Sequence, residues 1–312
     1  MSVNLLRMYE TFSSYEENKC LLEEPTVSYV MENEKTFFKK DNFIEIKRNI
    51  TKTGGIYIIG NQGSRAFDIS QISKMYVNGV ETTPKRYYTI TSIGEYTFKF
   101  IFCNLTSTAN MFYNMSDLTS IDLSNLDTSN VTDMSFMFGN CSGLTSIDLS
   151  KFDTSKVTKM NGMFHSCGSL TSIDVSNFIT NNLTHIDSMF QGCSSLTSID
   201  VSNFNTSNVR DFGYMFQGCG SLTSIDISNF KLTNFSTFIR FCDSCNNLIS
   251  LKIMDYPATA LDLTTDFSYM FLGISTNGKF IVNCEYYDKW NSIMSTQLPY
   301  FPQTWVIICE DK

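Results

Sequence analysis

A sixteen-residue phrase recurs along this chain at a constant interval. "MFHSCGSLTSIDVSNF" begins at Met163, and close variants of it begin at Met137, Met189 and Met215, each 26 residues from the next. The apolar columns of the repeat continue without a gap through six units, as in Leu118, Leu144, Leu170, Leu196, Leu222 and Leu248. A fixed period of this length is typical of chains in which each repeat buries its apolar side against its neighbours. The sequence therefore predicts a stack of repeats.

Each unit contains two kinds of apolar spacing. In "LTSIDLS", Ile147 and Leu149 alternate with polar residues, which is the spacing of a strand. In "VTKMNGMF", Val157, Met160 and Phe164 recur at intervals of three and four, which is the spacing of a short helix. The intervening "DTS" is typical of a turn, because Asp and Ser hydrogen-bond their own backbone. We therefore expect each unit to be a strand, a turn and a short helix, stacked into a right-handed solenoid with a parallel sheet along one face.

The L-x-x-L-x-L pattern of these units resembles the leucine-rich repeats, specifically the BspA-like surface-protein repeats of bacteria. Segments such as "LTSIDLSKFDTSKVTKMNGMF" carry the resemblance, which covers about residues 105 to 272. The resemblance implies a cell-surface or adhesive role, and related repeats also occur in proteins of phages and prophages. The expected fold class is thus α/β, a right-handed leucine-rich-repeat solenoid preceded by a small all-β domain.

The repeats divide the chain into four parts. We expect an N-terminal arm at 1–42, a small β-sandwich-like anchoring domain at 43–103, the solenoid at 104–272 and a C-terminal cap at 273–312. Short apolar segments separated by turn signals fill 43–103, and Asn78-Gly79 is typical of a two-residue hairpin turn. In the arm, "PTVSYVMENEKTFFKK" could form a further hairpin.

The repeat becomes irregular before the expected cap. The pair Met270-Phe271 arrives later along the chain than the constant period requires. The following residues predict a strand, a helix around Tyr287 to Met294 and a final strand at Trp305 to Ile308. Atypical terminal units of this kind cover the open end of a repeat core.

Charge and hydropathy exclude several functions. Residues 1–103 carry a net charge of +1 and residues 104–312 carry −9. A surface of that sign repels phosphates, which argues against nucleic acid as a partner. The amino terminus, "MSVNLLRMYETFSSYEENKC", lacks an apolar run of signal-peptide length, and no window reaches the 18 apolar residues of a membrane span. We expect neither ordinary secretion nor a membrane span.

The cysteines follow the repeat. Five of them form one column, in which Met115 takes the place one unit earlier: Cys141, Cys167, Cys193, Cys219 and Cys245. A column shared with Met is a packing position, and free Cys behaves as a small hydrophobe, so we expect a buried stack of thiols. Cys242 and Cys245 have zinc-like spacing, but no second pair matches them and both lie in core columns. The sequence leaves open whether Cys284 pairs with Cys309.

The two histidines do not form a catalytic set. His165 shares a polar column with Gln191 and Gln217 at the end of the expected helix, so we expect it to be solvated on the surface. His185 belongs to a different column. No nucleophile, base and orienting group are brought together by the repeat. We therefore expect no catalytic residues, no metal and no cofactor.

The outward face of the expected sheet is the candidate binding surface. Alternation points the third, fifth and seventh residues of each "LTSIDLS" away from the core. The candidate ligand-binding residues are Ser146, Asp148, Ser150, Ser172, Asp174, Ser176, Ser198, Asp200, Ser202, Ser224, Asp226 and Ser228. Parallel strands are about 4.8 Å apart, so a file of aspartates repels itself by roughly 1 kcal/mol per neighbouring pair in water. Either hydroxyls and main-chain amides relieve this repulsion, or the file binds cations or a basic or hydroxyl-rich partner.

These patterns favour a non-catalytic recognition or structural protein. We expect the solenoid to bind a protein or glycan on a host surface and residues 1–103 to join other structural proteins, with a homo-oligomer possible. The missing signal peptide, the thiol-like cysteines and the appended β domain favour a phage or prophage virion component, such as a fibre or capsid decoration. The alternative is a bacterial cell-surface adhesin of the BspA-like type.

Overall fold

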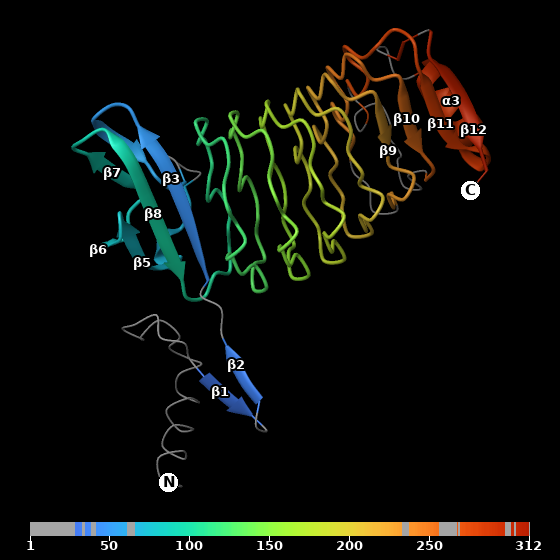
Figure 1. The fold of residues 1–312 in the computed structure, drawn as a ribbon. Coiled ribbons are helices and arrows are strands. Elements are labelled where there is room, and N and C mark those ends of the chain that lie inside the picture. The colour runs from blue at the N-terminus through green and yellow to red at the C-terminus, as the bar shows by residue number, and fades with distance from the viewer. Residues whose placement is uncertain are drawn as a thin grey trace.

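The structure is a computed structural model of the 312-residue chain. It describes residues 29–32, 35–38, 42–60, 66–232, 237–255, 267, 269–296, 301–302 and 304–311. Within these residues the protein is mostly β, with several sheets, few helices and a long series of repeated units (Figure 1).

Antiparallel strands form the region before the repeats. The hairpin expected in the arm is present as β1 (Tyr29–Glu32) and β2 (Lys35–Phe38). The sheet that follows has the order β3-β8-β5-β6, built from β3 (Phe43–Ile50), β8 (Gly94–Phe102), β5 (Ile72–Val77) and β6 (Val80–Thr82). A second, two-stranded sheet pairs β4 (Gly54–Tyr57) with β7 (Tyr87–Ile90). A short 3-10 helix, η1 (Ile69–Gln71), precedes β5.

The hairpin turn between β5 and β6 has the predicted chemistry. Asn78 and Gly79 have φ angles of 51° and 80°, and both therefore lie in the left-handed region that a two-residue hairpin turn requires. The Asn78 side chain also accepts the N–H of Thr97 at 2.8 Å, which fixes the turn against β8.

This β region covers the first repeat. The N–H of Phe43 donates to the carbonyl of Asn125 at 3.1 Å, and the Arg48 guanidinium pairs with Asp117. The Gln71 side-chain oxygen accepts the N–H groups of Thr106 and Ser107, both at 2.9 Å. One hydrophobic core runs without interruption from β3 through the repeats to the C-terminal strands. The open end of the first unit is therefore closed by β structure.

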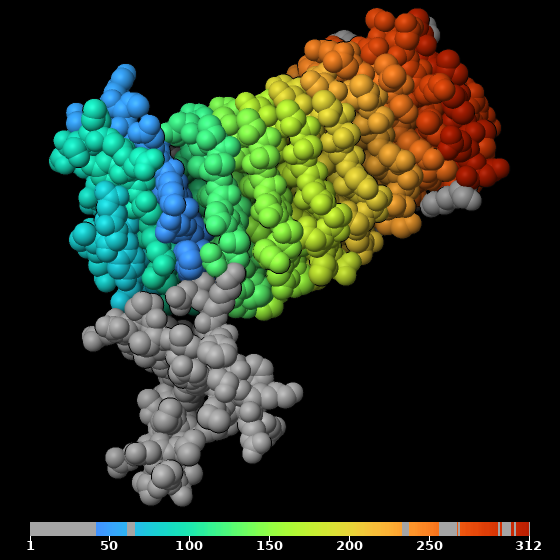
Figure 2. Space-filling model, viewed as in Figure 1, coloured from blue at the N-terminus to red at the C-terminus, as the bar shows by residue number. Residues whose placement is uncertain are grey.

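Successive repeats lie side by side and are joined by main-chain hydrogen bonds (Figures 1 and 2). Every second N–H of the Met-Phe segment donates to a carbonyl of the following unit. In one unit these donors are Met134, Phe136, Phe138 and Asn140, which donate to Lys159, Asn161, Met163 and His165 at 2.6–3.0 Å. All four bonds recur from Met160 to Ser166 and from Phe212 to Gly218, and three of them recur from Ser188 to Gly192, so the period of the sequence is the period of the stack.

The prediction of a short helix in each unit is wrong. The N–H groups of Met137, Gly139 and Cys141 donate to the carbonyls of Met134, Phe136 and Phe138, three positions earlier, at 3.0–3.2 Å. These bonds close overlapping turns, and the alternate N–H groups that a helix would use internally go to the next unit. Apolar spacing of three and four therefore arises here from turns rather than from an α-helix.

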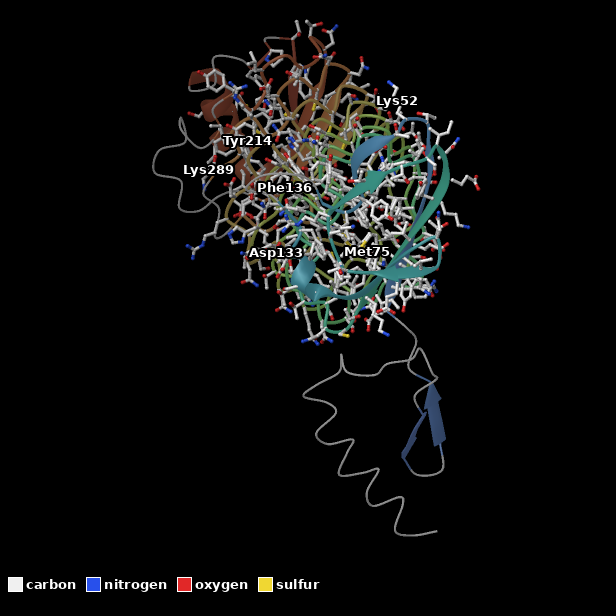
Figure 3. The ribbon with its side chains drawn as sticks, turned by 90° about the vertical axis from the view of Figure 1, so that its left-hand side faces the viewer. Lys52, Met75, Asp133, Phe136, Tyr214 and Lys289 are labelled. Atoms are coloured by element: carbon white, nitrogen blue, oxygen red, sulfur yellow. A yellow bond between two sulfur atoms is a disulfide. The ribbon has the colours of Figure 1, made fainter. Side chains whose placement is uncertain are left out.

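Two left-handed residues in each unit also exclude a helix. The first column has φ between 51° and 60° at Asn110, Phe136, Gly162, Ser188, Tyr214, Arg240 and Tyr269. The second has φ between 58° and 74° at Asn114, Asn140, Ser166, Gly192, Gly218, Ser244 and Gly273. This conformation costs a non-glycine residue roughly 1–2 kcal/mol. Phe136 and Tyr214 of the first column lie on the same side of the stack (Figure 3).

Identical side chains form ladders through the core. The rings of Phe112, Phe138, Phe164, Phe190 and Phe216 stack with centroids 5.3–5.8 Å apart and planes within 16° of parallel. The five predicted core cysteines are at most 1% exposed. Each of their Sγ atoms donates to the carbonyl of a Phe in the preceding unit, at 3.0–3.2 Å. The expected buried thiol stack is therefore confirmed.

A parallel sheet is present only at the C-terminal end of the described repeats. Its order is β12-β11-β10-β9, with β9 (Ser224–Asp226) and β10 (Ser250–Ile253) in the last units. β11 (Lys279–Asn283) and β12 (Val306–Glu310) follow the repeats. Between them lie the 3-10 helix η2 (Cys284–Tyr286) and the helix α3 (Tyr287–Thr296). The strand, helix and strand expected after the repeats are confirmed, but the continuous sheet expected along the whole stack is not.

Candidate functional site

The twelve predicted binding residues share one exposed face. Eleven of them are exposed, and Ser228 in the last of the four units is half-buried. Leu144, Leu149 and their equivalents point into the core, whereas Ile147 and its equivalents in the earlier units are half-buried at the edge of it. The repeat therefore presents the same Ser-Asp-Ser triplet at five successive levels of the stack, from Asp122 to Asp226.

Each aspartate of this file is held by the serine two positions later. The N–H groups of Ser124, Ser150, Ser176, Ser202 and Ser228 donate to Asp122, Asp148, Asp174, Asp200 and Asp226 at 2.8–2.9 Å. The hydroxyl and then the N–H of the serine hold the pKa of Asp148, Asp174 and Asp200 below the ordinary carboxyl value. Repulsion from Asp174 raises the pKa of Asp200, but it is the smaller influence. Local hydrogen bonds thus relieve the like-charge repulsion, as the first of the two alternatives expects.

The charge of the file reverses at its C-terminal end. Lys252 takes the next place in the column and is paired with Asp226 in the sheet register. Its ammonium group lies 2.8 Å from the Glu310 carboxylate of β12. The hydrogen bond to Glu310 is the main reason that the pKa of Lys252 is raised. The file of aspartates therefore ends at Asp226, and the residue beside it, Lys252, is already paired with Glu310.

The two histidines are not brought together. His185 is exposed, with Nδ1 2.8 Å from the Thr184 hydroxyl. His165 is half-buried rather than solvated, because its ring packs edge-on against Phe136 with centroids 5.9 Å apart. The expectation that His165 is a fully solvated surface residue is wrong for this reason. Within the described part of the chain, no cluster of three or more His, Cys, Asp or Glu could hold a metal ion.

The column of His165 ends in a polar network that the sequence did not predict. The Gln217 amide links the Gln191 side chain to the Asp243 carboxylate, with the Gln217 nitrogen 2.8 Å from Asp243 Oδ2. Arg240 Nη1 donates to the same oxygen at 2.9 Å, and Asp243 is only 2% exposed. Arg240 also lies over the ring of Tyr269, 5.0 Å from its centroid. Arg240 and the Gln217 amide therefore offset the cost of burying the Asp243 carboxylate, which would be high for an unpaired charge.

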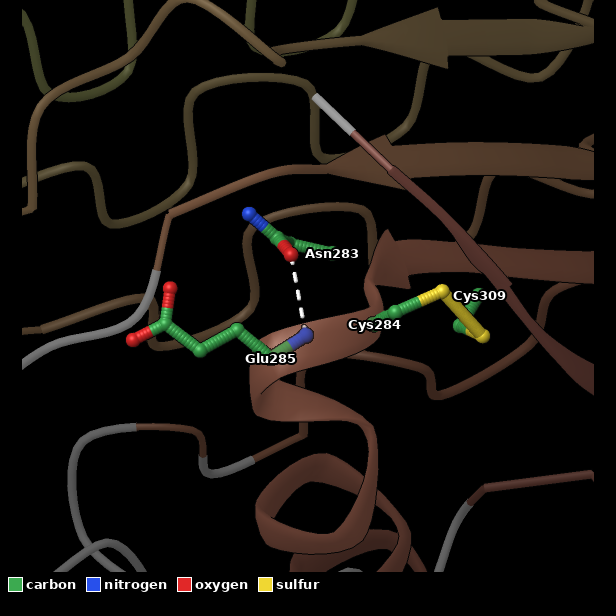
Figure 4. The surroundings of a disulfide bond; sticks show 4 residues. All are labelled: Asn283, Cys284, Glu285 and Cys309. Carbon is green, nitrogen blue, oxygen red and sulfur yellow. Dashed lines mark hydrogen bonds between the residues drawn. A yellow bond between two sulfur atoms is a disulfide. The ribbon is translucent and has the colours of Figure 1, made fainter.

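The C-terminal cysteines form a disulfide. Cys284 follows β11 and Cys309 lies in β12, with Cα atoms 4.6 Å apart (Figure 4). The Asn283 side chain accepts the N–H of Glu285 at 2.9 Å and so caps the N-terminus of η2, the 3-10 helix that contains Cys284. Cys103, next to the first repeat, is also disulfide-bonded. The six cysteines between these two places are reduced and buried.

No helix of the described residues is long and apolar enough to cross a membrane.

Comparison with known proteins identifies the repeats. The family described as "Mycoplasma protein of unknown function, DUF285" matches residues 81–173, 106–230 and 169–284. The chain matches no curated protein and no solved structure. The three matches overlap and advance along the stacked units, and together they extend from 81 to 284, more than half of the chain. The chain therefore belongs to the DUF285 family.

Proposed function

We propose that this protein is a non-catalytic recognition or structural protein whose repeats bind a protein or glycan. In this proposal the repeats form a right-handed leucine-rich-repeat solenoid of the BspA-like class. The outward face of Ser146, Asp148, Ser150 and their equivalents is the binding surface. Residues 43–103 cover the first unit and join the repeats to other structural proteins.

The repeated Ser-Asp-Ser face is the observation that supports this proposal. Its aspartates are exposed, ionised at neutral pH and oriented by the serine N–H groups at 2.9 Å. Side chains that are fixed before binding lose little conformational entropy when a partner arrives. The serine N–H and hydroxyl engage part of each carboxylate, and a carboxylate has further lone pairs that can accept from hydroxyl or cationic groups. A partner rich in hydroxyl groups or basic side chains fits such a surface.

This proposal has two possible settings, a phage or prophage virion and, as the alternative, a bacterial cell surface, and the disulfides fit both because both meet oxidising surroundings. Disulfides form and persist in oxidising compartments and are rare in the bacterial cytosol. The bond between Cys284 and Cys309 lies at one end of the repeats, and the bonded Cys103 lies at the other. Labelling intact cells of the producing bacterium with an impermeant biotin reagent distinguishes the two settings. Labelled chain at the envelope supports the cell surface, and chain found only in purified phage particles supports the virion.

A charge-removal pair tests the binding face. Asp174→Asn with Asp200→Asn removes two charges from the face while keeping a side-chain oxygen that can accept the serine N–H. Asp127→Asn with Asp153→Asn is the matched control. These two exposed aspartates accept the N–H of Ser129 and Ser155 at 3.0 and 2.9 Å but lie in the turns rather than on the outward face.

Binding of the full-length chain and both variants to a glycan array and to immobilised host-surface proteins is then compared. We expect the face variant to lose binding and the turn variant to keep it, with equal melting temperatures. Equal binding by all three chains would contradict the proposed surface.

A further inference from the structure

The outward face changes character at its C-terminal end. In the sheet register Asp226 lies beside Lys252, Lys252 beside Ile281, and Ile281 beside Ile308. The column that is acidic along the repeats is therefore aliphatic on the last two strands. Val306, on the same face of β12, is 58% exposed. An aliphatic patch thus replaces the polar face where the sheet ends.

The same strand has an unpaired edge. β12 is the terminal strand of its sheet, and no described strand pairs with its outer side (Figure 1). The N–H of Val306 donates to the carbonyl of Gly278, at 3.0 Å, beside β11. Because successive main-chain groups of a strand alternate in direction, Ile307 and Cys309 direct their N–H and C=O groups to the outer side. An edge with exposed aliphatic side chains is a template for another strand.

We propose that β12 is the interface of a two-fold symmetric dimer, in which the β12 strands of two copies of this chain pair antiparallel. Two-fold dimers use the same patch on both subunits, so the patch must complement itself. The aliphatic stripe and the unpaired edge lie on one strand and are buried by one contact. The two C-terminal sheets then join into a single continuous sheet.

The main-chain directions determine the register of this pairing. All of β12 overlaps when Ile307 faces the partner's Cys309 and each exchanges its outward N–H and C=O with the other. Ile308 then faces the partner's Ile308, and Val306 faces the partner's Glu310. Directly opposed Ile residues pack favourably, and no like charges are opposed in this register.

A second copy fits this edge better than it fits the edge of the N-terminal sheet. The terminal strand there, β6, has only three residues and offers few main-chain groups to a partner. Short edge strands of that kind are a common protection against edge pairing. β12 has five residues, no proline and two aliphatic side chains on its outward face.

Two substitutions at one exposed position test both the interface and its register. Val306→Glu places a carboxylate opposite the partner's Glu310, and the two-fold axis produces this opposition twice. Val306→Lys, the matched control, places an ammonium group there instead. Like charges directly opposite destabilise a strand pair and opposite charges stabilise it. We expect the dimer dissociation constant to rise about tenfold or more in Val306→Glu and to stay equal or fall in Val306→Lys.

Sedimentation equilibrium of the full-length oxidised chain gives these constants. The wild type should approach twice the monomer mass of 35.5 kDa as concentration rises. Circular dichroism and melting temperature of each variant establish that both remain folded. A wild type that stays monomeric at every soluble concentration would overturn the proposal. So would a dimer that both substitutions weaken equally, or that neither substitution changes, because the strands would then not pair in this register.

Discussion

The Oγ1 of Thr154 lies 2.7 Å from the N–H nitrogen of Ile179, and its own hydroxyl donates to the Ile179 carbonyl at 3.1 Å. The same residue type sits at this place in four successive units, and all four side chains are buried: Thr128, Thr154, Thr180 and Thr206. Each Thr accepts an N–H of the following unit at 2.6–2.8 Å. A buried hydroxyl thus substitutes for the main-chain bonds that the turn lacks at this point.

Replacement of Thr154 by Val should therefore be costly although the two side chains have the same shape. The change leaves the part-buried N–H and C=O of Ile179 without their partner, which costs about 1 kcal/mol or more. Urea unfolding measures the difference. Thr145→Val on the exposed face is the control, with an expected change within about 0.5 kcal/mol. Equal effects of the two changes would show that the hydroxyl of Thr154 is not important.

Gly162, which lies beside the Phe136 ring in a left-handed conformation, should not tolerate replacement by Ala. Gly162 has a φ of 60°, and a Cβ there would collide with the ring of Phe136. Gly162→Ala combines the left-handed cost with this collision, so we expect a loss of roughly 2–4 kcal/mol. Gly168→Ala is the control in the same unit, because its nearest contact is an ordinary 3.4 Å. In the Phe136→Ala background the cost of Gly162→Ala should become smaller, and an unchanged cost would contradict the collision.

The buried thiols should make stability fall at alkaline pH. Burial raises the pKa of Cys193 and Cys245 to about 12, whereas the pKa of a thiol in the unfolded chain is about 8.5. Below about pH 8.5 both states are protonated, and above it the unfolded chain releases protons that the folded chain keeps. The free energy of unfolding therefore decreases as pH rises from about 8.5 towards 12. Each such thiol contributes up to about 1.4 kcal/mol per pH unit.

Melting temperatures of the wild type and of Cys193→Val, measured across the mildly alkaline range, test this effect. The variant keeps a small apolar side chain and loses one titrating group, so its pH dependence should be shallower. Iodoacetamide should also fail to modify the six thiols until the chain unfolds. Rapid modification of the native protein at neutral pH is the result that would count against a closed core.

The C-terminal disulfide should stabilise the last strands. Cys284 and Cys309 are separated by 25 residues, and a loop of this size corresponds to about 3 kcal/mol in the chain-entropy account. Reductant should therefore lower the melting temperature. Because Cys103 is also disulfide-bonded, the control is the double variant Cys284→Ser with Cys309→Ser. The reductant should affect this variant less than the wild type, and an equal effect in both would mean that the bond contributes nothing.

The stacking of the units and the exposed face follow from the 26-residue period and from the alternation of apolar and polar residues within each unit. The strands of 43–102, the Asn78-Gly79 turn and the elements after the repeats were predictable because each is specified by local residues. The exposure of Asp148 and its equivalents was predictable because a polar residue between two core residues has to face away. Their role in binding remains a proposal, since repetition alone also reproduces them.

The interior of each turn was not predictable in the same way. The left-handed column contains Phe136, Gly162, Ser188, Tyr214 and Arg240, so no single residue type marks it. The spacing of Met134, Met137 and Phe138 fits a helix equally well, because a helix and a stack of turns differ only in where the N–H groups donate. The threonine ladder did leave a signal. Thr occupies this place in four successive units, before Leu232 takes it, while the residue before it varies from Asp153 to Ile179 to Asn205. The constant Thr indicates that the hydroxyl is needed in the interior rather than as a turn former.

Deletion of one repeat tests the stacking of identical units most directly. Removing 164–189 deletes one full period and joins two equivalent positions, so the remaining units should stack as before. Removing 164–176 deletes half a period and places turns against strands. The account predicts that the full-period deletion keeps a native circular dichroism spectrum and a cooperative melt, and that the half-period deletion does not fold. Two deletion variants that behave alike, both folded or both unfolded, would contradict it.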